Sequence, residues 1–310
     1  MNKIGILGAG AWPLAVASFF KKRNQDCIIW FHESDASVAT TRKTCYLQGY
    51  SVPQELEFTS SYKDVFDQCD LIIQFIPIQF LRKTIEEFKP FFDPARHKLV
   101  STTKGVEVDS ELFPSEIMKE VLGVSEFSCL FFDSKAIDLI EEKVGQSLLI
   151  AGHSHEVLQV LHKLFYSPAL NIELSLDVAG VQVLMSFKYY FVILKKYLKN
   201  PSLSDLAKKS ILNKSSRDMF TLVTRFGGQS ATMFNLLSGL SDFYIDMHAD
   251  SPINITGKAL PDGSSAKNLD FVMFEQAHSL LGLVSKARHS GVVLESEPLI
   301  RDYYKSLSIL

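Results

Sequence analysis

The length, composition and charge of this sequence exclude several classes of protein. Its 310 residues, 46% apolar and 22% charged, exceed the usual size of one domain and favour two domains with sizeable cores. A formal net charge of -3 gives no reason to expect binding to nucleic acid. The longest apolar stretch, residues 181–194, is interrupted by Gln182 and Lys188 and is shorter than the ~20 residues that span a bilayer, so we expect no membrane insertion.

The amino terminus predicts a strand, a glycine turn and a helix. Residues 4–7 are a short apolar run without alternation, which is typical of a buried parallel strand. Gly8 and Gly10 follow, and glycines let a pyrophosphate approach the first unpaired amides of a helix, where the helix dipole favours an anion. Pro13 replaces the third glycine of the G-x-G-x-x-G pattern, and a helix tolerates proline in its first turn. The pattern indicates a dinucleotide site, with a turn that binds nothing as the alternative.

Further apolar runs predict a doubly wound, Rossmann-type α/β domain. Ligands bind such a sheet beyond the carboxyl ends of its parallel strands, and Gly8, Pro77 and Lys104 all fall at such ends. The predicted strands are residues 27–31, 70–77, 98–103, 128–132 and 147–151, and the predicted helices include residues 64–69, 80–88 and 161–165.

The strand signal disappears near residue 177. Residues 181–198, 203–225 and 272–290 carry apolar side chains at 3.6-residue spacing. We therefore predict a dinucleotide-binding domain over residues 1–177 and an all-α domain over residues 178–310.

The sequence also bears on location and on metal binding. Met1 lies close to the first predicted strand, which leaves no space for a signal peptide, so we expect a cytoplasmic protein. The four cysteines are scattered without C-x-x-C spacing and fit reduced thiols. His153 and His155 have no nearby set of acidic or sulfur partners, so we expect no metal site.

Lys188 stands out within the most apolar helical segment. Lysine is almost never fully buried, because an unpaired ammonium is costly away from water, yet aromatic and aliphatic residues surround Lys188 in the sequence. The residue is therefore a candidate functional group. The alternative is that its side chain extends from a core helix into solvent.

Short motifs along nearly the whole chain occur in the order and spacing of one family. They are residues 8–12, residues 46–49 with Pro53 and Leu56, residues 70–79, 103–105, 164–168, 180–188 and 239–242, and Glu275. This order resembles that of the NAD(P)-dependent glycerol-3-phosphate dehydrogenases. The resemblance implies a Rossmann domain, a helical substrate domain and an active site between them. It also implies a small-molecule substrate, because this family interconverts dihydroxyacetone phosphate and sn-glycerol 3-phosphate for phospholipid synthesis.

The resemblance assigns roles to individual residues. Lys188 aligns with the catalytic lysine, which polarises and protonates the ketone oxygen as hydride arrives. Lys104 aligns with a second active-site lysine and Asp242 with the carboxylate that holds the catalytic ammonium; a solvated turn lysine and a helix cap are the alternatives. The implied cofactor-binding residues are Gly8, Gly10, Ala11, Trp12, His32, Glu33, Pro77, Lys104 and Glu275, and the implied substrate-binding residues are Lys104, Lys188 and Asn254.

The end of the second predicted strand bears on the choice of cofactor. His32 stands where this family often has an arginine able to hold a 2′-phosphate, and acidic Glu33 follows it. A carboxylate at this place suits the free ribose hydroxyls of NAD. The sequence therefore favours NAD as the cofactor and leaves NADP as an alternative. It also leaves a homodimer open as the assembly.

Several positions depart from the family pattern. Residues 131–134, Phe-Phe-Asp-Ser, replace a Ser-Gly-Pro-Ser segment, and Tyr189 replaces the asparagine after the catalytic lysine. Residues 250–257 lack the Arg-Asn pair that clamps the substrate phosphate. Two alternatives follow: a relative that binds nucleotide without catalysis, and a dehydrogenase of a different small hydroxy or keto compound.

Overall fold

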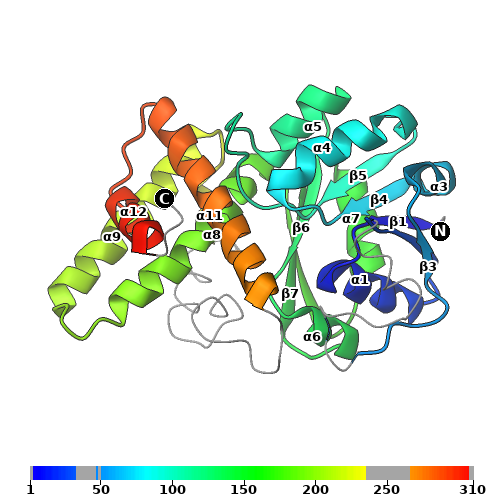
Figure 1. Cartoon of the computed structure of the whole chain (residues 1–310), viewed down its shortest axis with the longest axis horizontal. Coiled ribbons are helices and arrows are strands. Elements are labelled where there is room, and N and C mark those ends of the chain that lie inside the picture. Colours follow the sequence, from blue (N-terminus) through cyan, green and yellow to red (C-terminus); the bar gives the residue numbers. More distant parts are fainter. Residues whose placement is uncertain (1–2, 33–46, 48–49, 235–265, 307–310) are drawn as a thin grey trace. The chain divides into compact units, whose positions relative to one another are not determined.

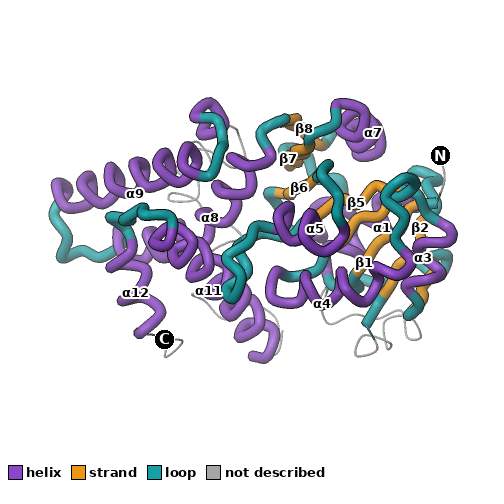
Figure 2. Tube along the Cα trace, turned by 90° about the horizontal axis from the view of Figure 1, so that it is seen from above, coloured by secondary structure: helices purple, strands orange, loops and turns teal. Residues whose placement is uncertain are grey.

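The computed structural model describes residues 3–32, 47, 50–234 and 266–306, and the chain divides into two compact units (Figure 1). The first unit comprises Met1–Thr103 and Ser115–Leu176, and the second comprises Lys104–Pro114 and Asp177–Leu310. Within the described residues, Figure 2 shows the strands gathered in the first unit and helices forming the second.

The first unit is built on an eight-stranded sheet with the order β3-β2-β1-β4-β5-β6-β7-β8. Neighbouring strands run parallel, except that β6 and β7 are antiparallel. The predicted Rossmann-type α/β sheet is confirmed, and its chain order reverses between β1 and β4. The strands are β1 Ile4–Leu7, β2 Cys27–Trp30, β3 Glu57–Thr59, β4 Leu71–Gln74, β5 Lys98–Ser101, β6 Ser128–Phe132, β7 Gln146–Gly152 and β8 Leu170–Ser175.

Helices cover both faces of the sheet, which explains why the central strands are continuous apolar runs. All four residues of β1 and of β2 are buried. Helices α1, α6 and α7 share one apolar core with the sheet, and Figure 1 shows α4 and α5 on the opposite face. The helices of this unit are α1 Ala11–Lys21, α3 Tyr62–Gln68, α4 Ile78–Phe88, α5 Pro114–Leu122, α6 Ala136–Glu141 and α7 His155–Phe165, with a short 3-10 helix at Lys89–Phe91.

Two strands and one strand direction were not predicted. Strand β3 has three residues and an exposed first position, Glu57, at the edge of the sheet. Strand β8 exposes Asn171 and Leu174, so it lacks the continuous apolar run that marks a central strand. Strand β7 runs antiparallel to β6 because the connecting segment brings the chain back into the sheet at the carboxyl end of β6. Phe132 therefore lies opposite Leu148.

The described part of the second unit is helical around its own apolar core. The helices are α8 Val178–Leu198, α9 Asp205–Arg225, α11 Ala266–His289 and α12 Glu297–Ser306, with a 3-10 helix, η3, at Ser230–Phe234. Within the described residues, the window Val178–Lys195 is long and apolar enough to cross a membrane by length and composition. Since 88% of that window is buried, α8 has the character of a core helix.

Candidate active site

The turn between β1 and α1 has the shape that a pyrophosphate requires. Gly8 has φ +117°, which side chains rarely adopt, and its amide donates to the carbonyl of Trp30 at 2.9 Å. Gly10 is the N-cap of α1 and provides no side-chain hydrogen bond, and a Cβ placed there would meet open space within 4 Å. No side chain therefore caps the first amides of α1, and the space in front of Gly10 is open. Gly8 and Gly10 thus fit a bound dinucleotide.

The implied cofactor residues next to this turn take defined places in the first unit. Ala11 and Trp12 are the first two residues of α1, and both are half-buried. Pro77 is the N-cap of α4, again without a side-chain cap. His32 is exposed just beyond β2, and its ring lies edge-on to Trp30 with centroids 6.4 Å apart.

A buried hydrogen-bond network joins the carboxyl ends of β4 and β5. The side-chain amide of Gln74 donates to the hydroxyls of Ser101 at 2.5 Å and Thr103 at 2.8 Å, and its oxygen accepts from the amide of Ile76 at 2.8 Å. The Thr103 hydroxyl donates to the carbonyl of Ile76 at 2.7 Å. This network fixes the turn that leads to Pro77 and the residue that precedes Lys104. Sequence reasoning missed it, although a lone glutamine within an apolar strand is its signal.

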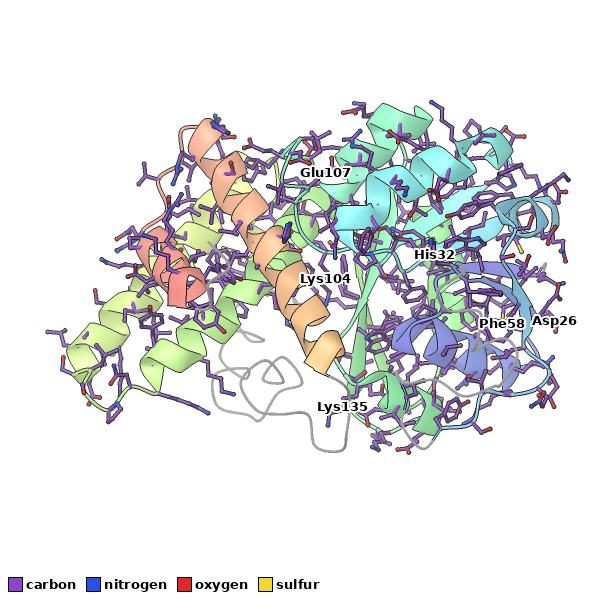
Figure 3. The ribbon with its side chains drawn as sticks, viewed as in Figure 1. Asp26, His32, Phe58, Lys104, Glu107 and Lys135 are labelled. Atoms are coloured by element: carbon purple, nitrogen blue, oxygen red, sulfur yellow. The ribbon has the colours of Figure 1, made fainter. Side chains whose placement is uncertain are left out.

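In the second unit, the segment after Lys104 packs against the helices α8 and α11. The amide of Gly105 donates to the Ser186 hydroxyl on α8 at 3.2 Å. A Cβ on Gly105 would lie 2.3 Å from the Ser279 hydroxyl oxygen on α11, and a Cβ on Gly282 would lie 2.4 Å from the carbonyl oxygen of Val106. Figure 3 shows Lys104 in this segment next to α11. The small residues of α8 and α11 therefore fix the backbone that carries Lys104.

Lys188 lies on α8 two residues after Ser186. Only 4% of its surface is exposed, and the buried neighbours on its helix include Phe187 and Tyr190. An ammonium at this place is largely removed from bulk water, which strengthens its interaction with any oxygen that it reaches. The second unit thus contains both the buried Lys188 and the fixed segment that follows Lys104.

Other candidate residues cannot be placed. Glu33, Asp242 and Asn254 lie outside the described residues. Glu275 belongs to α11, but its side chain is outside the described part of the chain. The roles of all four stay predictions.

Two buried cysteines of the first unit carry unreactive thiols. Burial raises the pKa of the Cys27 thiol and of the Cys69 thiol to about 12, so both stay protonated at neutral pH. Among the described residues, no group of three or more His, Cys, Asp or Glu side chains is placed to hold a metal ion.

The amino-terminal unit matches a known family. Residues 3–155 match the family described as "NAD-dependent glycerol-3-phosphate dehydrogenase N-terminus". The chain is also 24% identical over 315 residues to a glycerol-3-phosphate dehydrogenase [NAD(P)+] of Chlorobium chlorochromatii, covering 98% of this chain and 92% of the relative. A protein of the same name from Maricaulis maris is 27% identical over 301 residues, covering 94% and 88% of the two chains.

Solved structures share the fold over the whole chain. A glycerol-3-phosphate dehydrogenase from Coxiella burnetii has a TM-score of 0.81 at 22% identity and covers 99% of this chain and 94% of its own. A protein described as a ketopantoate reductase from Ralstonia solanacearum has a TM-score of 0.65 at 13% identity, and each chain is covered completely. At these identities the likeness shows the fold alone.

Proposed function

We propose that this chain, whose residues 3–155 match the NAD-dependent glycerol-3-phosphate dehydrogenase family, is a dehydrogenase of that family and reduces dihydroxyacetone phosphate to sn-glycerol 3-phosphate. The observation that carries the proposal is the burial of Lys188, which is 4% exposed on the core helix α8. The same helix holds the segment after Lys104 through Ser186. A second support is the uncapped turn of Gly8 and Gly10, which fits the dinucleotide.

The chain's own groups account for the proton side of the reaction. Bound NAD(P)H supplies the hydride that forms the new C–H bond at the substrate C2. The ammonium of Lys188 donates a hydrogen bond to the ketone oxygen and gives it a proton as negative charge builds there. Lys104 and Asp242 orient that ammonium and the substrate in this proposal, and Asn254 contributes to substrate binding.

The proposal extends to the domains, the cofactor, the location and the assembly. Residues 1–177 bind the dinucleotide, and residues 178–310 bind the substrate together with Lys104, which belongs to the second compact unit. Glu33 beside His32 favours NAD, with NADP as the second cofactor to test. We place the enzyme in the cytoplasm and take a homodimer as the assembly to be tested by its mass in solution.

One assay tests the reaction and its alternatives. The purified chain is mixed with NADH and dihydroxyacetone phosphate, and absorbance at the nicotinamide band is followed. We expect oxidation of NADH, and a loss of about 10²-fold or more in kcat for Lys188→Met with NADH binding retained. Lys195→Met is the matched control, because Lys195 is also buried in α8, at 7% exposure, and we expect it to keep most of the activity.

The other outcomes contradict the proposal in different ways. NADH binding without turnover of any ketone indicates a nucleotide-binding relative that has lost catalysis. Turnover of unphosphorylated ketones alone indicates a different substrate, in keeping with the absence of the Arg-Asn pair from residues 250–257. Equal losses in Lys188→Met and Lys195→Met mean that the cost lies in removing a buried lysine, not in catalysis.

A further inference from the structure

The side chain of Gln79 carries a buried amide without a partner. Gln79 lies in the first turn of α4, directly after Pro77 and Ile78. Its Nε2 and Oε1 atoms are both inaccessible to solvent, and neither has a hydrogen-bond partner among the described residues. Folded proteins pair the great majority of such groups, so an unpaired amide here needs an explanation.

Gln74, five residues earlier, shows how the chain uses a glutamine for structure. Both polar atoms of the Gln74 amide are occupied, by Ser101 and Thr103 on one side and by Ile76 on the other. These bonds also hold both backbone groups of the turn at Ile76. The hydrogen bonds that hold this turn are therefore complete without the Gln79 side chain. The backbone that carries Gln79 is fixed before any ligand binds.

The position of Gln79 is the ligand-binding edge of the sheet. Strands β1 and β4 are neighbours with Leu7 opposite Gln74, and the amide of Phe75 donates to the carbonyl of Leu7 at 2.9 Å. A Cβ on Gly8 would lie 3.5 Å from Phe75. The turn that leads into α4 is thus adjacent to the glycine turn, where the strand order reverses and doubly wound sheets bind nucleotides.

We propose that the Gln79 side chain binds the cofactor. The identity of that cofactor rests on the proposed function. An amide needs a partner that accepts from its N–H and a partner that donates to its oxygen. A phosphate only accepts and would leave Oε1 unpaired, whereas a ribose diol or a carboxamide satisfies both atoms. Gln79 therefore binds a ribose diol or the nicotinamide carboxamide of NAD(P)H and does not bind the pyrophosphate.

Gln79→Leu separates a ligand-binding role from a structural one. Because the amide has no partner to lose in the free protein, the variant should melt at the same temperature as wild type or higher. Its dissociation constant for NADH, measured by fluorescence titration, should rise about tenfold, as expected for the loss of one well-placed group. The matched control is Gln74→Leu, which removes a partnered amide from the same segment and should lower the melting temperature of the free protein.

ADP-ribose distinguishes the two chemical sources. It contains both riboses of the cofactor but no nicotinamide. If Gln79→Leu weakens NADH and ADP-ribose equally, the partner is a ribose diol, and if it weakens only NADH, the partner is the carboxamide. Either result supports the inference.

Three results would overturn it. The first is a variant that binds NADH as tightly as wild type. The second is a fall in melting temperature as large as that of Gln74→Leu without a loss of NADH affinity, and Gln79→Met is to be measured if Gln79→Leu does not fold. The third is a wild-type chain that binds no NADH, which also removes the proposed function, whereas the first two leave the proposed function intact.

Discussion

Phe132 at the end of β6 stacks on Trp12 in the first turn of α1, with ring centroids 4.5 Å apart and planes 13° apart. Phe132 also meets Phe165 of α7 edge-on, at 5.7 Å. Its neighbour Phe131 is buried within the sheet. The two bulky residues that replace the small Ser-Gly pair of the family pattern therefore pack within the first unit. Phe132 fixes the indole beside the glycine turn.

The stack on Trp12 predicts the effect of restoring a small residue. Phe132→Ser removes an aromatic pair worth about 0.5–1.5 kcal/mol beyond its buried area and leaves the indole of Trp12 without that support. We expect lower stability in urea and a red shift of the Trp12 emission, recorded with Trp30, the other tryptophan, replaced by phenylalanine. Phe132→Tyr should keep both properties. Unchanged emission in Phe132→Ser would show that the ring does not hold the indole.

The sequence predicts those elements whose signal is local and leaves out those whose signal depends on distant partners. Strands β1 and β2 are continuous apolar runs, because helices bury both of their faces. Strand β3 is a three-residue edge strand and β8 is half exposed, so neither has the composition of a buried run. The reversal of β7 depends on where the segment after β6 leads, which no local pattern records.

The same distinction applies to the candidate site. Gly8, Lys104 and Lys188 belong to motifs or stand out by composition, so the sequence alone marks them as candidates, and their roles stay predictions. Gln74 acts through Ser101 and Thr103, which come from another strand, so its role becomes visible only when the two strands lie side by side. Gln79 ends the motif of residues 70–79, but a binding role for its side chain is indicated only by the absence of a partner in the folded chain.

The Gln74 network predicts non-additive losses of stability. Gln74→Leu leaves the Ile76 amide without its buried partner, which should lower the free energy of unfolding by about 1–3 kcal/mol. Thr103→Val removes a second member of the network. Because the two changes break shared bonds, the double variant should lose less than the sum of the single losses in urea unfolding. Additive losses would mean that the two side chains act independently.

Gly105 predicts a steric test of the Lys104 segment. Gly105→Ala places a Cβ 2.3 Å from the Ser279 hydroxyl oxygen, at a φ of +101° that side chains rarely adopt. We expect a loss of about 1–3 kcal/mol in stability and a fall in kcat, because the backbone beside Lys104 must move. Ser279→Gly in the same chain removes the clash with the Ser279 side chain and leaves both the 2.9 Å approach to the Cα of residue 279 and the backbone strain, so it should restore part of both. A variant as stable and active as wild type would show that this contact fixes nothing.

The ion pair between Arg23, two residues after α1, and Glu142 after α6 predicts a specific dependence of stability on pH. The Arg23 Nη2 lies 2.6 Å from the Glu142 Oε2, with side chains 27% and 34% exposed. The hydrogen bond from Arg23 lowers the pKa of Glu142 below its ordinary value of 4.5, against a smaller effect of burial. The folded state thus favours the ionised carboxylate, so the stabilisation is complete above that ordinary value and is lost as the pH falls through the lowered pKa.

Glu142→Gln should therefore reduce stability at neutral pH and reduce it less in acid. Since the pair is partly solvated, we expect a difference from wild type of up to about 1 kcal/mol at pH near 7 that is smaller near pH 3 and is lost as the pH falls through the lowered pKa of Glu142. Urea unfolding of both proteins at the two pH values measures it, and added salt should shrink the difference at neutral pH because it screens the two charges. A difference that persists unchanged at low pH would assign the effect to packing of the side chain and not to its charge.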